Sequence, residues 1–164
     1  MFTLGAMLTA TATYAAADVE QQLVGTWFIE VGGVLPDGGK YQNIMNVDEG
    51  GTADIVGGWM FGAAGTKFTD SPASVVSTDG GTFVINMFAF LADAQTGAPS
   101  ALNVTVYRGT MQEGGESFTA EADLYYLPCT VERCPAPDPG ALGTPATVAQ
   151  VTGVKLATPF SQSN

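Results

Sequence analysis

Four short turns, each an acidic residue followed by two glycines, divide this chain into segments of strand length. They are PDGG (36–39), DEGG (48–51), TDGG (78–81) and QEGG (112–115). Glycine adopts the positive φ angles that tight turns between antiparallel strands require. The segments between the turns are rich in Val, Ile, Phe, Thr and Tyr, residues that favour strands. This pattern predicts an all-β protein.

The turns and the segments between them predict eight strands. The strands span residues 25–32, 41–48, 52–59, 73–77, 82–91, 101–111, 117–127 and 147–157. Strands at this spacing form antiparallel barrels or sandwiches. We favour an eight-stranded antiparallel up-and-down β-barrel with few or no helices. A chain of 164 residues is most often one domain, which we place at 18–164.

Alternation of apolar and polar residues assigns a face to each side chain of a half-buried strand. In the 101–111 strand, for example, the aliphatic residues lie opposite Asn103, Thr105 and Tyr107. The apolar faces form the predicted barrel interior: Ile29, Met45, Phe83, Ile85, Met87, Val104, Val106, Phe118, Leu124 and Tyr126. Such an interior either encloses one small apolar guest or is filled by its own side chains.

The 82–91 strand, TFVINMFAFL, is apolar on both faces. Phe83, Ile85 and Met87 lie on one face, and Val84 and Phe88 on the other. A strand of this kind is covered on both sides. The cover is a packed N-terminal segment, the long 128–146 loop or a second copy of the chain; the last predicts a homodimer through strand 82–91.

The two ends of the chain and its cysteines indicate a compartment. The first 17 residues are apolar or small and end in three alanines before Asp18, which predicts a secretory signal segment at 1–17. The alternative is an N-terminal strand or helix of the mature fold. Cys129 and Cys134 are the only cysteines, and in an exported chain such a pair predicts a structural disulfide. We therefore expect a secreted or periplasmic protein with no membrane span in the mature chain.

The charge balance narrows the range of partners. Sixteen acidic and five basic residues give a formal net charge of -11. Binding to a phosphate backbone requires clustered lysine and arginine, and the five basic residues here are scattered along the chain. We expect no nucleic acid and no anionic membrane surface among the partners.

Few residues are suited to catalysis. The chain has no histidine, which excludes Ser–His and Cys–His nucleophilic catalysis. It has no phosphate-binding or dinucleotide-binding motif, and we expect no cofactor and no metal. Glu121 and Asp123 share a strand face, which we expect to be exposed to solvent rather than to form an acid–base site. No catalytic residue is assigned.

Polar candidates for orienting a guest are Tyr41, Asn43, Tyr107 and Arg108. Arg108 follows three aliphatic residues at even spacing, so we expect its side chain to enter the barrel, where it would need a carboxylate partner. The alternative is a strand-end arginine that reaches water. Residues 57–72 predict either a lid with Trp59, Met60 and Phe61 at its apolar tip or a loop packed on the core. The candidate ligand-binding set is Tyr41, Asn43, Met45, Trp59, Phe83, Ile85, Met87, Val106, Arg108, Phe118 and Tyr126.

The stretch LVGTWFIEV resembles the Gly-x-Trp opening of lipocalins and related calycin barrels, with Gly25 and Trp27 at the matching positions. The later order of turns and strands is similar to that of lipocalin-like domains secreted by bacteria, over residues 21–157. The resemblance implies that Trp27 closes the barrel floor beneath a basic residue, here Lys155. The related allene-oxide-cyclase-like barrel has the same number of strands and implies a pocket-templated cyclase.

Three functions are consistent with these patterns. The first is an exported barrel that binds a small apolar or amphipathic molecule without transforming it. The second is a cofactor-free cyclase or isomerase that works by shape and a few polar groups. The third is a structural or interaction module with a filled core and the 82–91 strand as its interface.

Overall fold

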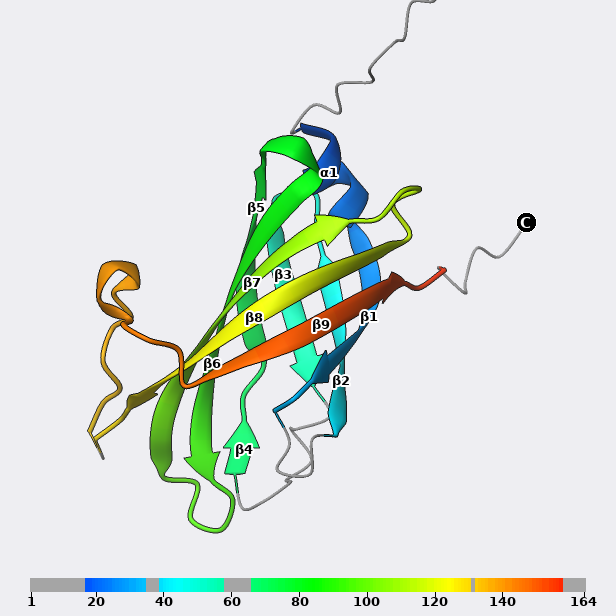
Figure 1. The fold of residues 1–164 in the computed structure, drawn as a ribbon. Coiled ribbons are helices and arrows are strands. Elements are labelled where there is room, and N and C mark those ends of the chain that lie inside the picture. The colour runs from blue at the N-terminus through cyan, green and yellow to red at the C-terminus, as the bar shows by residue number, and fades with distance from the viewer. Residues whose placement is uncertain (1–16, 35–38, 58–65, 131, 158–164) are drawn as a thin grey trace, which may run out of the picture.

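A closed antiparallel β-barrel is the central feature of the computed structural model, which describes residues 17–34, 39–57, 66–130 and 132–157 (Figure 1). A short helix and two 3-10 turns are the only helical elements of the described residues. The elements are α1 (Ala17–Leu23), β1 (Gly25–Gly32), β2 (Lys40–Val47), β3 (Thr52–Gly57), β4 (Thr66–Phe68), β5 (Ser71–Thr78), β6 (Thr82–Asp93), β7 (Pro99–Met111), β8 (Ser117–Pro128) and β9 (Thr147–Lys155), with 3-10 turns at Asp79–Gly81 and Pro139–Ala141. This confirms the all-β prediction.

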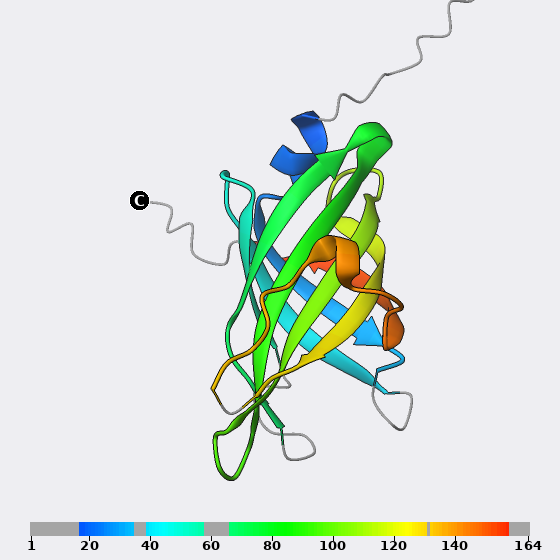
Figure 2. The same ribbon diagram turned by 90° about the vertical axis from the view of Figure 1, so that its left-hand side faces the viewer.

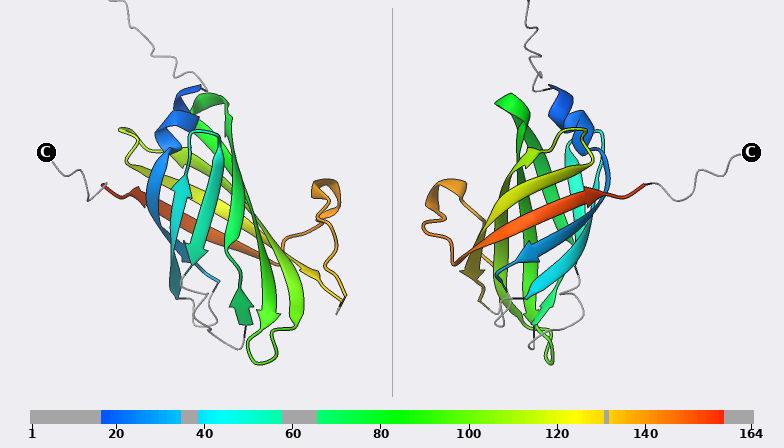
Figure 3. Two further views of the ribbon diagram at one scale, coloured as in Figure 1. Left: turned by 180° about the vertical axis from the view of Figure 1, so that it is seen from behind. Right: turned by 45° about the vertical axis from the view of Figure 1, so that its right-hand side comes forward.

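The strands follow one another around the barrel in chain order. The first and last strands close it, with Trp27 of β1 opposite Lys155 of β9 in antiparallel register. Figure 3 shows β1 and β9 side by side, seen from behind and from the right. The predicted up-and-down barrel is therefore confirmed. The strand ends differ from the predicted ones by at most two residues.

Two strands, β4 and β5, lie end to end beside β6 and together occupy one strand position in the barrel wall. Each pairs with a different part of β6: Phe68 of β4 lies opposite Leu91, and Ala73 of β5 lies opposite Met87. The break between them is held to β6 by Thr69, whose Oγ1 accepts a hydrogen bond from the Phe90 amide at 3.1 Å. The sequence analysis missed β4, because three residues are too few to show alternation. Of the predicted lid at 57–72, residues 58–65 lie outside the described part of the chain.

Helix α1 seals one end of the barrel, at the top of Figure 1. Val19 and Leu23 are fully buried there against Trp27. The Trp27 indole Nε1 donates a hydrogen bond to the Leu23 carbonyl at 2.7 Å, so the buried polar end of the ring has a partner. The predicted cleavage at residue 17 stays a prediction, since residues 1–16 lie outside the described ranges.

Aromatic rings fill the barrel next to this seal. Phe118 lies 5.2 Å from Trp27 and 5.2 Å from Phe83, measured between ring centres. Each phenylalanine covers a glycine on the neighbouring strand: a Cβ at Gly109 would lie 2.2 Å from the Phe83 ring, and one at Gly153 would lie 2.1 Å from the Phe118 ring. The two glycines give the rings room to lie flat on the barrel wall, as in other sheets where an aromatic covers a glycine.

The faces of β7 are the reverse of the predicted ones. Asn103, Thr105 and Tyr107 are buried and alternate with Val104 and Val106. The two valines lie outside the barrel, in a second hydrophobic cluster, so their predicted inward position is wrong. The outer cluster comprises Leu102, Val104, Val106 and Tyr125, with Val84, Phe88, Leu127, Cys129, Cys134 and Leu142 packed against it.

The segment after β8 covers this outer cluster, which explains the reversal. Figure 2 shows it crossing in front of β6 and β7. Its Leu142 packs on the cluster together with Cys129 and Cys134, which form the predicted disulfide. Three candidates were proposed to cover the outer face of the 82–91 strand. In the structure the 128–146 loop covers it. Phe90, on the same outer face of β6, remains 51% exposed.

Candidate functional site

A cavity of about 50 Å³ opens at the end of the barrel away from α1. This is the lower end in Figure 1, where β4 lies. Its described wall is formed by Val34, Tyr41, Asn43, Ile55, Gly57, Phe68, Thr69, Ser71, Met87, Asn103, Leu124 and Tyr126. The barrel is therefore filled by its own side chains at one end and hollow at the other.

Strand alternation brings the lining residues together. On β2, Tyr41 and Asn43 are turned inward, while Gln42 between them is exposed. On β7 and β8, Asn103 lies opposite Tyr126 in register. Because side chains on a strand alternate between faces, the start of β2, β5 and β7 and the end of β8 all direct side chains into the same end of the barrel.

A buried hydrogen-bond network fixes the carboxamide of Asn103. Its Nδ2 donates to the Tyr125 carbonyl at 3.2 Å, and its Oδ1 accepts from the Thr105 hydroxyl at 2.9 Å. A carbonyl can only accept a hydrogen bond, so the orientation of the amide follows from this partner. Asn103 is 2% exposed. The network holds its side chain rigidly in the cavity wall.

Three tyrosines lie in or just behind the cavity wall, and their hydroxyls stay protonated at neutral pH. Burial raises the pKa of Tyr41, the nearby Tyr126 raises it further, and a hydrogen bond with Asn43 opposes them in part. Burial, followed by the effect of Tyr41, raises the pKa of Tyr107 well above 10.0. Burial also raises the pKa of Tyr126. The Tyr107 hydroxyl lies 3.7 Å from the Met87 sulfur.

The described cavity wall carries no formal charge at neutral pH. None of its residues is Asp, Glu, Lys or Arg, and its tyrosines are protonated. Among the described residues, no three His, Cys, Asp or Glu side chains are grouped to hold a metal ion. The arrangement is suited to binding an uncharged molecule through apolar contact and a few hydrogen bonds.

The candidate ligand-binding residues fall into four groups. Tyr41, Asn43, Met87 and Tyr126 line the cavity. Met45, Phe83, Ile85 and Phe118 point into the barrel but belong to the packed core. Val106 and Arg108 lie outside the barrel. Trp59 lies outside the residues that the structure describes.

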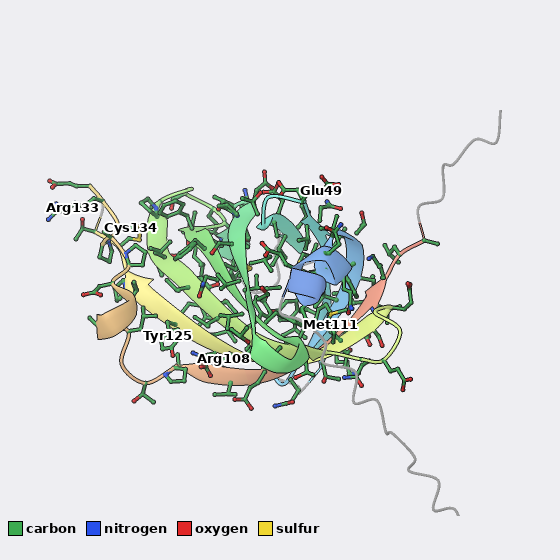
Figure 4. All side chains as sticks on the ribbon, turned by 90° about the horizontal axis from the view of Figure 1, so that it is seen from above. Glu49, Arg108, Met111, Tyr125, Arg133 and Cys134 are labelled. Carbon is green, nitrogen blue, oxygen red and sulfur yellow. A yellow bond between two sulfur atoms is a disulfide. The ribbon has the colours of Figure 1, made fainter. Side chains whose placement is uncertain are left out.

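Arg108 does not enter the barrel, which corrects the prediction. Its side chain is 57% exposed and forms an ion pair with Asp123 of β8. Figure 4 shows Arg108 and Tyr125 on the outer side of the wall, and Arg133 and Cys134 on the segment after β8. Arg108 shares its face with Val104 and Val106, so the reversal of β7 carried all three outward. Glu121 and Asp123 also lie on the outer face: Glu121 is exposed to solvent as expected, whereas the Asp123 side chain, paired with Arg108, is mostly buried.

Sequence reasoning missed several cavity residues, including Phe68, Ser71 and Asn103. The signal for Asn103 is its even spacing with Tyr107, a candidate for orienting a guest. Asn103 also begins the sequence Asn103-Val104-Thr105, which matches the pattern of N-glycosylation sites, but the structure places this asparagine inside the barrel rather than on the surface.

The residues expected to close the barrel floor do meet. The Lys155 ammonium lies 5.4 Å from the Trp27 ring centre and donates to the Gln22 carbonyl at 2.9 Å. Gly25 makes room for it, because a Cβ there would lie 2.9 Å from the Lys155 Cε. Gly25 also has a φ of 130°, which side-chain-bearing residues rarely adopt.

Fold and cavity define the class of protein: a closed eight-stranded antiparallel β-barrel with a neutral cavity at one end. This architecture is compatible with a lipocalin-like fold. The chain matches no protein-family model and no curated protein. Within the described residues, no helix is long and apolar enough to span a membrane.

Proposed function

We propose that this protein is an exported, lipocalin-like barrel that binds a small apolar or amphipathic molecule in the cavity without transforming it. One observation carries the proposal. The α1 end is packed solid by Trp27, Phe83 and Phe118, whereas the other end holds a cavity with both apolar and hydrogen-bonding side chains. Concave sites of this composition are typical of small-molecule binding.

Export is supported by the disulfide between Cys129 and Cys134. Disulfides persist in oxidising compartments and are rare in the cytosol. We therefore place the protein in the periplasm or outside the cell. Binding is favoured over turnover because the described lining contains only groups that stay neutral near neutral pH.

The test is native mass spectrometry of the full chain isolated from its own compartment, followed by denaturing extraction. We expect a reproducible small molecule in complex with the protein. The variant Ser71→Leu adds a branched side chain at a buried cavity position and should abolish the complex. Ser74→Leu, on the exposed face of the same strand, is the matched control and should retain it.

Three outcomes discriminate between the functions. Loss of the molecule in the Ser71 variant alone supports binding in the cavity. Conversion of the molecule by the wild-type protein contradicts the proposal and favours the cyclase or isomerase. Wild-type protein that carries nothing and takes up no extracted molecule favours the interaction module.

The homodimer through strand 82–91 stays a prediction. The apolar surface available for such a dimer is smaller than the sequence predicts, because Val84 and Phe88 pack against the outer cluster. The surface that remains for a partner is an outer apolar groove. Phe90 lines it together with Leu102 and Pro137. Sedimentation velocity over a range of concentrations tests it, and a monomer throughout contradicts it.

A further inference from the structure

The cavity wall has more hydrogen-bond donors than the protein itself uses. A carboxamide nitrogen carries two hydrogens, and Asn103 gives one to the Tyr125 carbonyl. No other described residue accepts the second. Since Asn103 lies in the cavity wall and is 2% exposed, its partner must come from inside the cavity.

Asn43, on β2, adds a second donor of the same kind. It is 6% exposed and lines the same cavity. Its side chain forms a hydrogen bond with Tyr41, and this contact uses at most one of the two amide hydrogens. One amide hydrogen of Asn43 is then left for another acceptor. A buried donor with no partner destabilises the fold, so a water or a ligand oxygen is expected to accept this hydrogen.

The surroundings disfavour an anionic group as that acceptor. A buried carboxylate needs a cation or it loses most of its hydration energy without compensation. No residue of the described wall is cationic. The two lysines near this end of the barrel, Lys40 and Lys67, are exposed to solvent; Lys40 is paired with Glu30 at 3.6 Å, and the whole chain carries a charge of -11.

The volume limits the part of the molecule that the cavity encloses. One water needs about 10–15 Å³ of such space, so 50 Å³ accommodates a few waters or the polar end of a small molecule, whose apolar body then extends toward the open mouth of the cavity. A carbonyl oxygen would replace the waters at the two carboxamides, while Met87 and Leu124 contact the carbon atoms next to it.

We infer that the cavity selects uncharged molecules that present a carbonyl-type acceptor on a small apolar body, with Asn43 and Asn103 as the residues that determine this specificity. This inference rests on the proposed function. It names the chemical class of the ligand: neutral ketones, esters or amides rather than fatty acids or plain hydrocarbons.

Three probes of nearly equal shape test it: acetophenone, benzoate and isopropylbenzene. Each is titrated into the full chain, labelled with ¹⁵N, and the amide shifts of cavity residues are followed by NMR. Acetophenone should bind about three- to tenfold more tightly than isopropylbenzene, the range that one neutral hydrogen bond supplies. Benzoate should be weaker than both.

Variants assign the effect to the two carboxamides. Asn43→Leu and Asn103→Leu should each remove most of the advantage of acetophenone over isopropylbenzene. Asn46→Leu, on the exposed face of β2, is the matched control and should leave it unchanged. If loss of the Thr105 and Tyr125 contacts prevents the Asn103 variant from folding, the Asn43 variant, which disturbs only the Tyr41 contact, decides.

The outcomes separate this inference from the proposed function. Equal binding of benzoate and acetophenone overturns the requirement for neutrality. Equal binding of isopropylbenzene, or an unchanged preference in both asparagine variants, overturns the role of the donors. In each case the cavity still binds a small molecule. Absence of cavity shifts with all three probes contradicts the proposed function itself, and the inference with it.

Discussion

The ammonium nitrogen of Lys155 lies 5.4 Å from the centre of the Trp27 ring and donates a hydrogen bond to the Gln22 carbonyl. This contact joins β9, β1 and the C-terminal turn of α1 at the point where the barrel closes. A cation over an indole face is attracted to the negative potential of the ring. One side chain thus stabilises both the seam of the barrel and its seal.

Replacement of Lys155 by methionine should lower the free energy of unfolding by about 1–3 kcal/mol, because it removes a charged hydrogen bond and a cation–π contact while keeping an unbranched apolar side chain. Urea unfolding followed by tryptophan fluorescence measures the change. Lys40→Met is the control: its pair with Glu30 is exposed, so it should cost well under about 1 kcal/mol. Equal effects of the two substitutions would contradict the role of Lys155.

Gly109→Ala should destabilise the barrel by about 1–3 kcal/mol, since the new methyl would overlap the Phe83 ring and over-pack the core. Thermal unfolding by circular dichroism measures it. Gly32→Ala is the control, because Gly32 is also in a strand and the nearest atom to its added Cβ is 3.7 Å away.

A double variant distinguishes overlap from loss of backbone freedom. Phe83→Leu should recover part of the stability lost in Gly109→Ala, giving a favourable coupling energy between the two positions. Additive effects would mean that the cost of alanine at 109 does not come from the ring.

The stability of the protein should fall in alkaline solution. The pKa values of Tyr41, Tyr107 and Tyr126 are raised in the folded protein, because burial disfavours the phenolate. Unfolded tyrosines release their protons near 10.0, before the folded ones do. The stabilisation is therefore complete below that pH and is lost as the pH rises through the folded values.

Urea midpoints measured from neutral pH to beyond the ordinary tyrosine pKa should decrease with pH, and Tyr107→Phe should make the decrease shallower. Tyrosinate absorbance of the folded protein, recorded in parallel, gives the titration itself. Constant midpoints, together with early ionisation of all tyrosines in the folded state, would show that the three hydroxyls are not held in their neutral form.

The packing of residues 128–146 on the outer cluster should depend on the disulfide between Cys129 and Cys134. Replacing both Cys129 and Cys134 by serine should cost about 2 kcal/mol, the value for closing a loop this short in the chain-entropy model. Hydrogen exchange should increase within 128–146, because the two cysteines and Leu142 anchor that segment to the outer cluster. Protection in β1 should not change at equal stability. Simultaneous loss of hydrogen-exchange protection in β1 and in 128–146 would instead mean that the 128–146 segment and the barrel unfold as one unit.

Prediction from sequence was accurate where local chemistry decides the structure. The glycine turns and the segments between them located eight of the nine strands to within two residues, and alternation placed Met45 of β2 on the inner face, where Tyr41 and Asn43 also lie. It failed on β7. Alternation separates Val104 and Val106 from Asn103 and Thr105 but does not say which face is inside, and we assumed that the aliphatic face packs inward.

The segment that covers the outer face made that assumption fail. With Leu142 and the disulfide packed on it, the aliphatic face of β7 is buried outside the barrel, and the polar face is free to line the cavity. Arg108 moved outward with the valines for the same reason. Residues distant in the chain decide the direction of a strand whose two faces are both buried.

By itself, the sequence determined the all-β barrel, its strand order and the disulfide, because turn geometry and strand alternation are local properties. The tertiary structure alone decided where the barrel is filled and where it is hollow, and which polar side chains reach the hollow end. Those features depend on how α1 seals one opening and how 128–146 covers one wall, and packing between distant segments leaves no periodic signal in the chain.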